Sequence, residues 1–253
     1  MKKIIVGNWK MNPSDLGEAK QLLNNLKKDL TKTRFKDVEV VICAPFVWLS
    51  DLSKNLSKKI KLGAQNLFWE RQGAYTGEIS GLMLKNLGCQ YVLVGHSERR
   101  VYLNENDSMI NKKIVAALSV YLKPILCVGE KEGEDMSQVI KRQLIEGLKN
   151  ISGSRAENLV IAYEPVWAIG TGNPCQPDDA MKAALFIRKI LSDIYNRKIA
   201  DKISIIYGGS TNSKNAKSYI AEAEMDGLLP GGASLNVSEF IEMIKEINKN
   251  AQT

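Results

Sequence analysis

Short apolar runs recur along the chain, and mixed apolar and polar segments separate most of them. The runs lie at residues 4–6, 38–43, 60–63, 91–94, 124–128, 159–162, 203–207 and 227–229. Most are continuously apolar and rich in β-branched residues, which is typical of strands buried on both faces of a parallel sheet. The pattern therefore predicts eight buried strands.

Several of the intervening segments have apolar stripes at helical spacing. Residues 15–30 follow Ser14, a candidate N-terminal cap, and residues 177–195 open with Pro177, which suits a first helical turn. Residues 237–247 form a third such segment. The expected buried faces are Leu16, Ala19, Leu22, Leu23, Leu26 and Leu30; Met181, Ala184, Leu185, Leu191 and Ile194; and Phe240, Ile241, Ile244 and Ile247.

Buried strands that alternate with helices predict a parallel sheet whose outer face the helices cover. Eight such units in 253 residues match a (β/α)8 TIM barrel, with residues 1–253 as a single domain. A doubly wound open sheet is the alternative, but no G-x-G-x-x-G follows the first strand. In both architectures ligands bind at the C-terminal ends of the strands.

The bulk composition excludes several classes of protein. No apolar stretch reaches the ~18 residues of a membrane span, and the N-terminal run ends at Asn8, too early for a signal peptide. We therefore expect a cytoplasmic protein with no membrane partner. The cysteines (Cys43, Cys89, Cys127 and Cys175) are far apart, so neither a disulfide framework nor a zinc site is expected.

The net charge of +7 raises the question of a nucleic-acid partner. The lysines, however, are scattered among carboxylates, which indicates solvated surfaces and not a nucleic-acid footprint. We therefore expect no nucleic acid, although a diffuse positive field would attract a small anionic substrate.

Polar side chains and glycine pairs follow several of the predicted strands. Asn8 and Lys10 follow the first, His96 the fourth and Glu164 the sixth, and His96 is the only histidine in the chain. Glycine pairs follow the last two strands, in YGGS and LLPGGASL, where backbone N–H groups can approach a phosphate closely. Any one of these features has an ordinary structural explanation, such as a turn or a strand exit. Together they predict one rim with a base, an electrophile, a cation and a phosphate site.

Seven motifs connect these features to a known family. GNWKMN, GAQNLFWERQGAYTGEIS, VGHSERR, LCVGE, AYEPVWAIGTG, YGGS and DGLLPGGASL occur in this order along the chain. With them, essentially the whole sequence resembles the triosephosphate isomerase family. The resemblance implies an enzyme of glycolysis and gluconeogenesis that interconverts dihydroxyacetone phosphate and D-glyceraldehyde 3-phosphate through an enediolate. It also implies that no metal or organic cofactor is needed.

The resemblance implies a role for each group at the rim. Glu164 is the expected base, and a neutral His96, flanked by Lys10 and Asn8, is the expected donor to the enediolate oxygens. Glu98 is expected to steady Lys10, and Ser97 to lie near the base. The residues expected to bind the substrate and its phosphate are Asn8, Lys10, Gly170, Ser210, Gly231 and Gly232.

The resemblance also implies a lid at residues 165–175. Its first hinge is Pro165, Val166 and Trp167, its tip Ala168, Ile169, Gly170, Thr171 and Gly172, and its second hinge Asn173, Pro174 and Cys175. Closure would bring the Gly170 N–H to the phosphate and exclude water. Ile169 and Leu229 would form an apolar clamp over Glu164. Two departures from the family pattern, Pro230 and the Asn-Pro-Cys hinge, bear on loop motion and affinity but not on the chemical groups.

The connection at residues 67–79 is long for a barrel and carries several aromatic side chains. In the family this loop enters the neighbouring subunit, which implies a homodimer with Asn12, Tyr75 and Thr76 at its interface, close to Lys10. Rival hypotheses are another phosphosugar enzyme, a catalytically silent barrel and a nucleic-acid binder. The set of Lys10, His96 and Glu164 argues against the first, and the presence of both the lysine and the base argues against the second.

Overall fold

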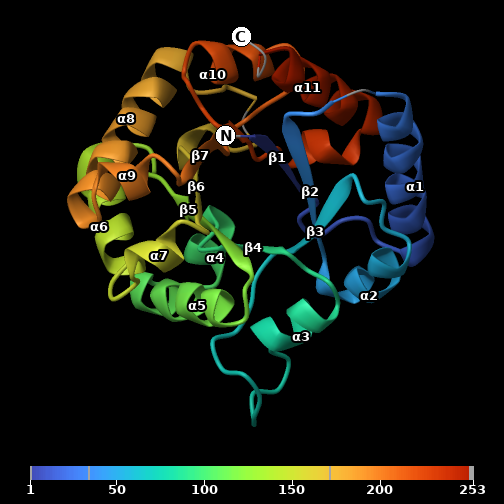
Figure 1. The fold of residues 1–253 in the computed structure, drawn as a ribbon, viewed down its shortest axis with the longest axis horizontal. Coiled ribbons are helices and arrows are strands. Elements are labelled where there is room, and N and C mark those ends of the chain that lie inside the picture. Colours follow the sequence, from blue (N-terminus) through green and yellow to red (C-terminus); the bar gives the residue numbers. More distant parts are fainter. Residues whose placement is uncertain (1, 34, 171, 251–253) are drawn as a thin grey trace.

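The computed structural model of the chain describes residues 2–33, 35–170 and 172–250. Over these ranges eight parallel strands close into a barrel in sequence order, with helices around it (Figure 1). The strands are β1 (Lys3–Asn8), β2 (Val38–Ala44), β3 (Ile60–Ala64), β4 (Tyr91–Val94), β5 (Lys123–Val128), β6 (Val160–Tyr163), β7 (Ser204–Tyr207) and β8 (Gly227–Leu228). The predicted (β/α)8 barrel is confirmed, and each predicted run overlaps an observed strand.

Helices follow the strands and pack around the outside of the barrel (Figure 1). They are α1 (Leu16–Lys32), α2 (Phe46–Lys54), α3 (Gly81–Asn86), α4 (Ser97–Tyr102), α5 (Asp107–Ser119), α6 (Met136–Gly147), α7 (Gly153–Ala156), α8 (Pro177–Ile194), α9 (Arg197–Ala200), α10 (Ala216–Ala221) and α11 (Val237–Asn250), with the 3-10 helices η1 (Val166–Ala168) and η2 (Gly232–Leu235). None of the helices in the described ranges has the length and apolarity that a membrane crossing requires.

Successive residues of a strand enter two separate cores, which explains why the strands are apolar throughout. Ile4 and Val6 belong to a cluster formed by strand residues inside the barrel, whereas Ile5 packs in the cluster between strands and helices. The barrel closes where β1 pairs with β8, with Ile4 opposite Gly227. A Cβ at Gly227 would overlap the carbonyl of Ile4, so glycine is needed at this closure.

Two helices differ in detail from the sequence prediction. Asp15, not Ser14, caps α1, because the helix begins one residue later and the Asp15 carboxylate then accepts from the Glu18 N–H at 2.9 Å. The predicted face of α8 is also partly wrong, since Leu185 is 58% exposed. Its buried residues are Ala180, Ala183, Ile187, Ile190 and Leu191, and the small alanines allow close packing on the barrel. For α11, the predicted buried face is confirmed.

The segment between β3 and α3 projects from the body of the barrel (Figure 1). It is organised by its own aromatic side chains, because the Phe68 ring lies 4.1 Å from that of Trp69 and 4.8 Å from that of Tyr75 between centroids. Tyr75 and Thr76 remain exposed at the far end. The projection is therefore an ordered arm that presents these two residues to the surroundings.

Candidate active site

The C-terminal ends of the strands surround a cavity of about 320 Å³. Residues from β1, from the segments after β1 and β4, from the predicted lid and from the loops after β7 and β8 meet there. They include Asn8, Lys10, His96, Ile169, Gly170, Ser210, Leu229, Gly231 and Gly232. The structure thus brings together, on one rim, residues that the sequence distributes over more than 220 positions. They include residues for which the sequence predicts catalytic, phosphate-binding and clamp roles, and Glu164, the predicted base, lies behind this lining, next to His96.

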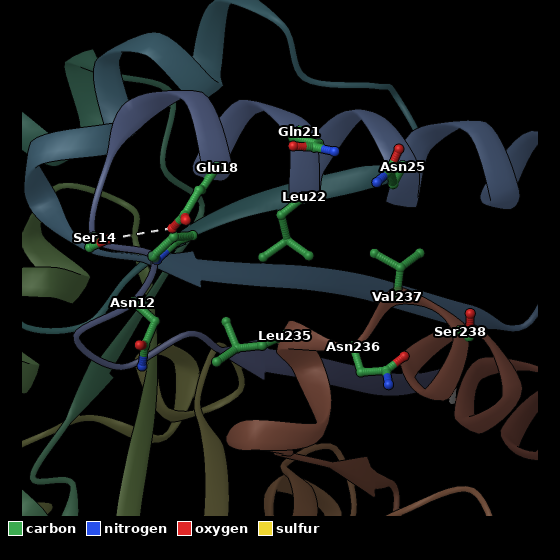
Figure 2. Close-up of a pocket in the computed structure, with 11 residues that line it drawn as sticks. Asn12, Ser14, Glu18, Gln21, Leu22, Asn25, Leu235, Asn236, Val237 and Ser238 are labelled. Atoms are coloured by element: carbon green, nitrogen blue, oxygen red, sulfur yellow. Dashed lines mark hydrogen bonds between the residues drawn. The ribbon is translucent and has the colours of Figure 1, made fainter.

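A larger groove of about 640 Å³ lies outside this rim, between α1 and the start of α11. Figure 2 shows Leu22 of α1 facing Leu235 and Val237 across it. Of the predicted site residues only Asn12 lines this groove, and it contains no predicted acid, base or phosphate loop. We therefore place the candidate active site in the smaller cavity, because the chemical groups converge there.

Glu164 lies directly after β6 and is only 1% exposed. Its Oε2 accepts a hydrogen bond from the Ser97 N–H at 3.1 Å, which fixes the carboxylate against the start of α4. Its Oε1 has no hydrogen-bond partner among the described residues and lies 3.4 Å from His96 Nε2. A buried, unpaired carboxylate oxygen is costly, and such groups are found where a protein needs them for chemistry.

The contacts of His96 define which of its nitrogens carries a proton. The Glu98 N–H donates to Nδ1 at 3.2 Å, so Nδ1 offers a lone pair and is not protonated. In the neutral ring the single hydrogen is then on Nε2, which is the nitrogen that faces Glu164. The geometry therefore presents an N–H donor to the cavity.

Lys10 is held from several directions. Its backbone has a φ of 53°, a left-handed conformation that is uncommon outside glycine, and its N–H donates to Asn8 Oδ1 at 3.0 Å. The side chain of Gln65 donates to the Lys10 carbonyl at 2.8 Å. The ammonium reaches Glu98 Oε1 at 2.5 Å, so the carboxylate orients it. A Cβ at Gly231 would lie 3.0 Å from Lys10 Cε, and glycine leaves that space open.

The glycine pair after β7 allows close packing beside the base. A Cβ at Gly208 would meet Glu164 Cγ at 2.8 Å, and one at Gly209 would overlap the hydroxyl of Tyr207. The pair after β8 leads into η2, and both of its glycines line the cavity. Exposed N–H groups without side chains in front of them suit an anionic group such as phosphate.

The predicted lid begins as η1 and reaches the cavity at its tip. Gly170 and Gly172 have φ values of 71° and 75°, and both line the cavity with Ile169. Thr171 lies outside the described residues. The Trp167 indole N–H donates to Glu130 Oε1 at 2.8 Å. This hydrogen bond joins the first hinge to the segment that follows β5. The lid therefore lies over the rim in this structure.

Comparison with known proteins decides the family. The sequence profile described as Triosephosphate isomerase matches residues 3–247. The chain belongs to the triosephosphate isomerase family. The triosephosphate isomerase of Dictyoglomus turgidum is 47% identical over 249 residues, which cover 96% of this chain and 99% of the relative. Those of Alkaliphilus oremlandii (45% over 248 residues) and Carboxydothermus hydrogenoformans (44% over 252 residues) each cover 96% of this chain and 98% of the relative.

The two departures from the triosephosphate isomerase pattern are accommodated in the structure. The carbonyl of Pro230 accepts from the Asn8 N–H at 2.9 Å, so proline at this position keeps β8 joined to β1. In the second hinge, the residue after Pro174 is fixed through its backbone, because the Cys175 N–H donates to the hydroxyl of Tyr207 at 3.1 Å. Neither proline displaces a group of the candidate site.

The sequence analysis did not predict some residues that adjoin the candidate site. Gln65 directly follows β3, and Gly129 and Glu130 directly follow β5. Their signal in the sequence is the same as for the other site residues, because each is a polar residue or a glycine at the end of a strand. Tyr207 is the last residue of the apolar strand β7, and its place in that run indicated only a core role.

A buried ionic cluster supports the segment that carries His96 and Glu98. Arg99 of α4 donates to Glu105 Oε1 at 2.5 Å, and the Lys113 ammonium donates to the same oxygen and to Asn66 Oδ1. Burial lowers the pKa of the Lys113 ammonium from its ordinary value. Removing one partner of such a cluster would leave an uncompensated buried charge, so the cluster holds α4 in place. In the described ranges no group of three or more histidine, cysteine or acidic side chains is arranged to hold a metal.

Proposed function

We propose that the candidate site carries out the triosephosphate isomerase reaction with Glu164 as the base. The family interconverts dihydroxyacetone phosphate and D-glyceraldehyde 3-phosphate, and the chain is an intramolecular aldose–ketose isomerase of glycolysis. One observation carries the residue assignment. The unpartnered oxygen of a buried carboxylate faces a histidine N–H at 3.4 Å, beside a cavity lined by glycine loops.

The proposed reaction needs two proton transfers on neighbouring carbons. Glu164 takes the proton from the carbon beside the carbonyl, and the C–H electrons form the carbon–carbon double bond of an enediolate. His96 Nε2–H and the Lys10 ammonium stabilise the charge on oxygen, and Asn8 holds the backbone of Lys10 through its N–H. Protonated Glu164 then returns the proton to the other carbon, while the hydroxyl proton moves between the two oxygens. Side chains complete this balance without a cofactor.

We propose that the enzyme binds the substrate mainly through its phosphate group. The backbone N–H groups at Gly170, Gly231 and Gly232 would bind it, with Ser210 on the opposite side. The lid then encloses the reacting carbons, and Ile169 and Leu229 keep water from Glu164. Residues 1–253 would act as one catalytic domain, and we place the enzyme in the cytoplasm, where glycolysis takes place.

A coupled assay tests this function directly. D-glyceraldehyde 3-phosphate is supplied as substrate, and the dihydroxyacetone phosphate formed is reduced by an auxiliary dehydrogenase that consumes NADH. We expect a rate proportional to the amount of protein and abolished by heat unfolding. A folded protein, verified by circular dichroism, that shows no isomerisation above the buffer rate would contradict the proposal.

We further propose that the chain functions as a homodimer. Large exposed apolar side chains lie on the connections after four successive strands, and one of them, Met11, is 94% exposed. They are Met11, Val47, Tyr75 and Tyr102. Because successive strands are neighbours in the barrel, these side chains share one side of it, and an apolar surface of this kind suits a protein partner.

A cavity in the same surface suits the arm of a second copy. It measures about 260 Å³ and is lined by Lys10, Met11, Glu98 and Tyr102, among others. The exposed end of the arm, with Tyr75 and Thr76, would enter this cavity beside Asn12 of the other copy. The Lys10–Glu98 pair would then be shielded from water only in the dimer.

Replacing Thr76 with arginine should separate the subunits. The added cation would face Lys10 of the other copy in a closed interface, and we expect a monomer whose kcat is lower by roughly tenfold or more. Mass by light scattering, measured with turnover at the same concentration, checks this. Thr31→Arg, at an exposed position on α1, is the matched control and should remain an active dimer. A fully active monomer would overturn the proposal.

A further inference from the structure

Two buried tyrosines hold the backbone of Cys175, the last residue of the second lid hinge. The Cys175 N–H donates to the hydroxyl of Tyr207 at 3.1 Å, and the hydroxyl of Tyr219 donates to the Cys175 carbonyl at 2.6 Å. Tyr207 ends β7, whereas Tyr219 belongs to α10. Both backbone groups of one hinge residue are thus bonded to side chains from the body of the barrel.

The two rings form one rigid support. Their centroids are 3.9 Å apart and their planes differ by 18°, so they stack. Both side chains are buried, at 0% and 1% exposure for Tyr207 and Tyr219. Gly209 has no side chain to compete with the Tyr207 hydroxyl for space. Burial raises the pKa of both phenols above the ordinary value, so each hydroxyl keeps its proton.

The hinge residue lies where the chain passes from the lid into α8. Pro174, before it, has a fixed φ and no N–H, and Pro177, shortly after it, begins the helix. Gln176 between them makes no side-chain cap to the helix. The position of the Cys175 peptide groups therefore depends on the two tyrosines, and it determines the direction in which the lid leaves the barrel.

The hydrogen bond of Tyr219 is present while the lid covers the rim. Ile169, Gly170 and Gly172 line the cavity that contains Lys10 and His96, so the tip of the lid is at the site in the same structure. We propose that Tyr219 is a positioning residue of the isomerase, whose hydroxyl holds the second hinge in the conformation that places the lid over the substrate. This inference rests on the proposed function of the site. Tyr219 touches no reacting atom and acts through Cys175.

The ring stack alone could also explain Tyr219, as part of the core, and a hydroxyl-only substitution separates the two roles. Tyr219→Phe keeps the stacked ring and removes the donor to Cys175. Tyr195→Phe is the matched control, because the buried hydroxyl of Tyr195 has no hydrogen-bond partner among the described residues. The melting temperatures of both variants establish that they fold like the parent.

The decisive readout compares two substrates that differ in the phosphate. D-glyceraldehyde 3-phosphate uses the lid, whereas D-glyceraldehyde lacks the group that holds the lid closed. Because one hydrogen bond is lost from the closed conformation, Tyr219→Phe should lower kcat/KM for the phosphorylated substrate about fivefold. It should leave the slow rate on D-glyceraldehyde within about twofold, whereas Tyr195→Phe should change neither rate. Relaxation dispersion of the Trp167 indole should show a smaller closed population in Tyr219→Phe only.

Each other outcome counts against the inference. Equal losses on both substrates would mean that Tyr219 serves the structure of the barrel and not the lid. Unchanged kcat/KM and unchanged Trp167 exchange would mean that the hydroxyl has no positioning role. A parent enzyme that is inactive on D-glyceraldehyde 3-phosphate would instead remove the proposed function on which the inference rests.

Discussion

Substitution of Glu164 by glutamine should lower kcat for D-glyceraldehyde 3-phosphate by about a thousandfold or more, because an essential proton transfer loses its base. The amide has the shape of the carboxylate, and its oxygen can still accept from the Ser97 N–H that now holds Oε2 at 3.1 Å. The amide is not basic, however, and cannot take a proton from carbon. Steady-state turnover in the coupled assay gives the loss.

Binding should survive in the same variant. Calorimetric titration with dihydroxyacetone phosphate should give an affinity within about tenfold of the parent KM, because the glycine loops and Lys10 are unchanged. Glu157→Gln is the control, since Glu157 is exposed and pairs with Lys202 at 2.7 Å, far from the rim. A kcat within tenfold of the parent would show that another group is the base.

Substitution of Gly129 by alanine should lower kcat by about a hundredfold, the order of loss that a displacement near 1 Å causes at a catalytic group. A Cβ at this position would overlap the carbonyl of Glu164, and backbone cannot yield as a flexible side chain can. The peptide that carries Glu164, the proposed base, must therefore move. The side chain of Gln143 accepts a hydrogen bond from the Gly129 N–H at 2.8 Å. This bond holds the backbone of residue 129 in place, so that the backbone cannot easily shift away from Glu164.

The same substitution should also lower the melting temperature, which differential scanning calorimetry measures together with turnover. Gly147→Ala is the matched control, because a Cβ there meets only leucine and isoleucine side chains at 3.4 Å or more. Gly147 ends α6, where alanine is the better helix former, so the control should be fully active and no less stable. If Gly129→Ala retained the parent kcat, the position of Glu164 would not depend on this contact.

The fold was predictable because burial leaves a clear pattern in the sequence. Strands with residues such as Ile4 and Ile5 in two different cores are apolar without interruption, and that pattern identified every strand of the barrel. The faces of the helices were less predictable. Leu185 fits a helical stripe but faces solvent, while Ala180 and Ala183 pack on the barrel because small residues allow close approach.

The residues of the candidate site were predictable to the extent that they follow strands. Glu164 and His96 are polar residues that follow apolar runs. Because the C-terminal ends of all strands of a parallel barrel lie on one rim, the two residues could be placed near each other. Side chains that support the site or the lid hinge from elsewhere left no such pattern. Tyr219 lies within a helix, and only the packing of α10 against the hinge shows that its hydroxyl meets Cys175.

The closure of the barrel between β1 and β8 has a consequence for how the protein is made. Residues 227–228 are the only strand partner that β1 has on that edge in the described chain, with Ile4 and Ile5 opposite them. During synthesis on the ribosome the first strand emerges long before the last. One edge of β1 therefore has no strand partner until almost the whole chain has been translated. An unpaired apolar edge can bind other chains. Until residues 227–228 emerge, the nascent chain therefore exposes a strand edge to which another chain could pair.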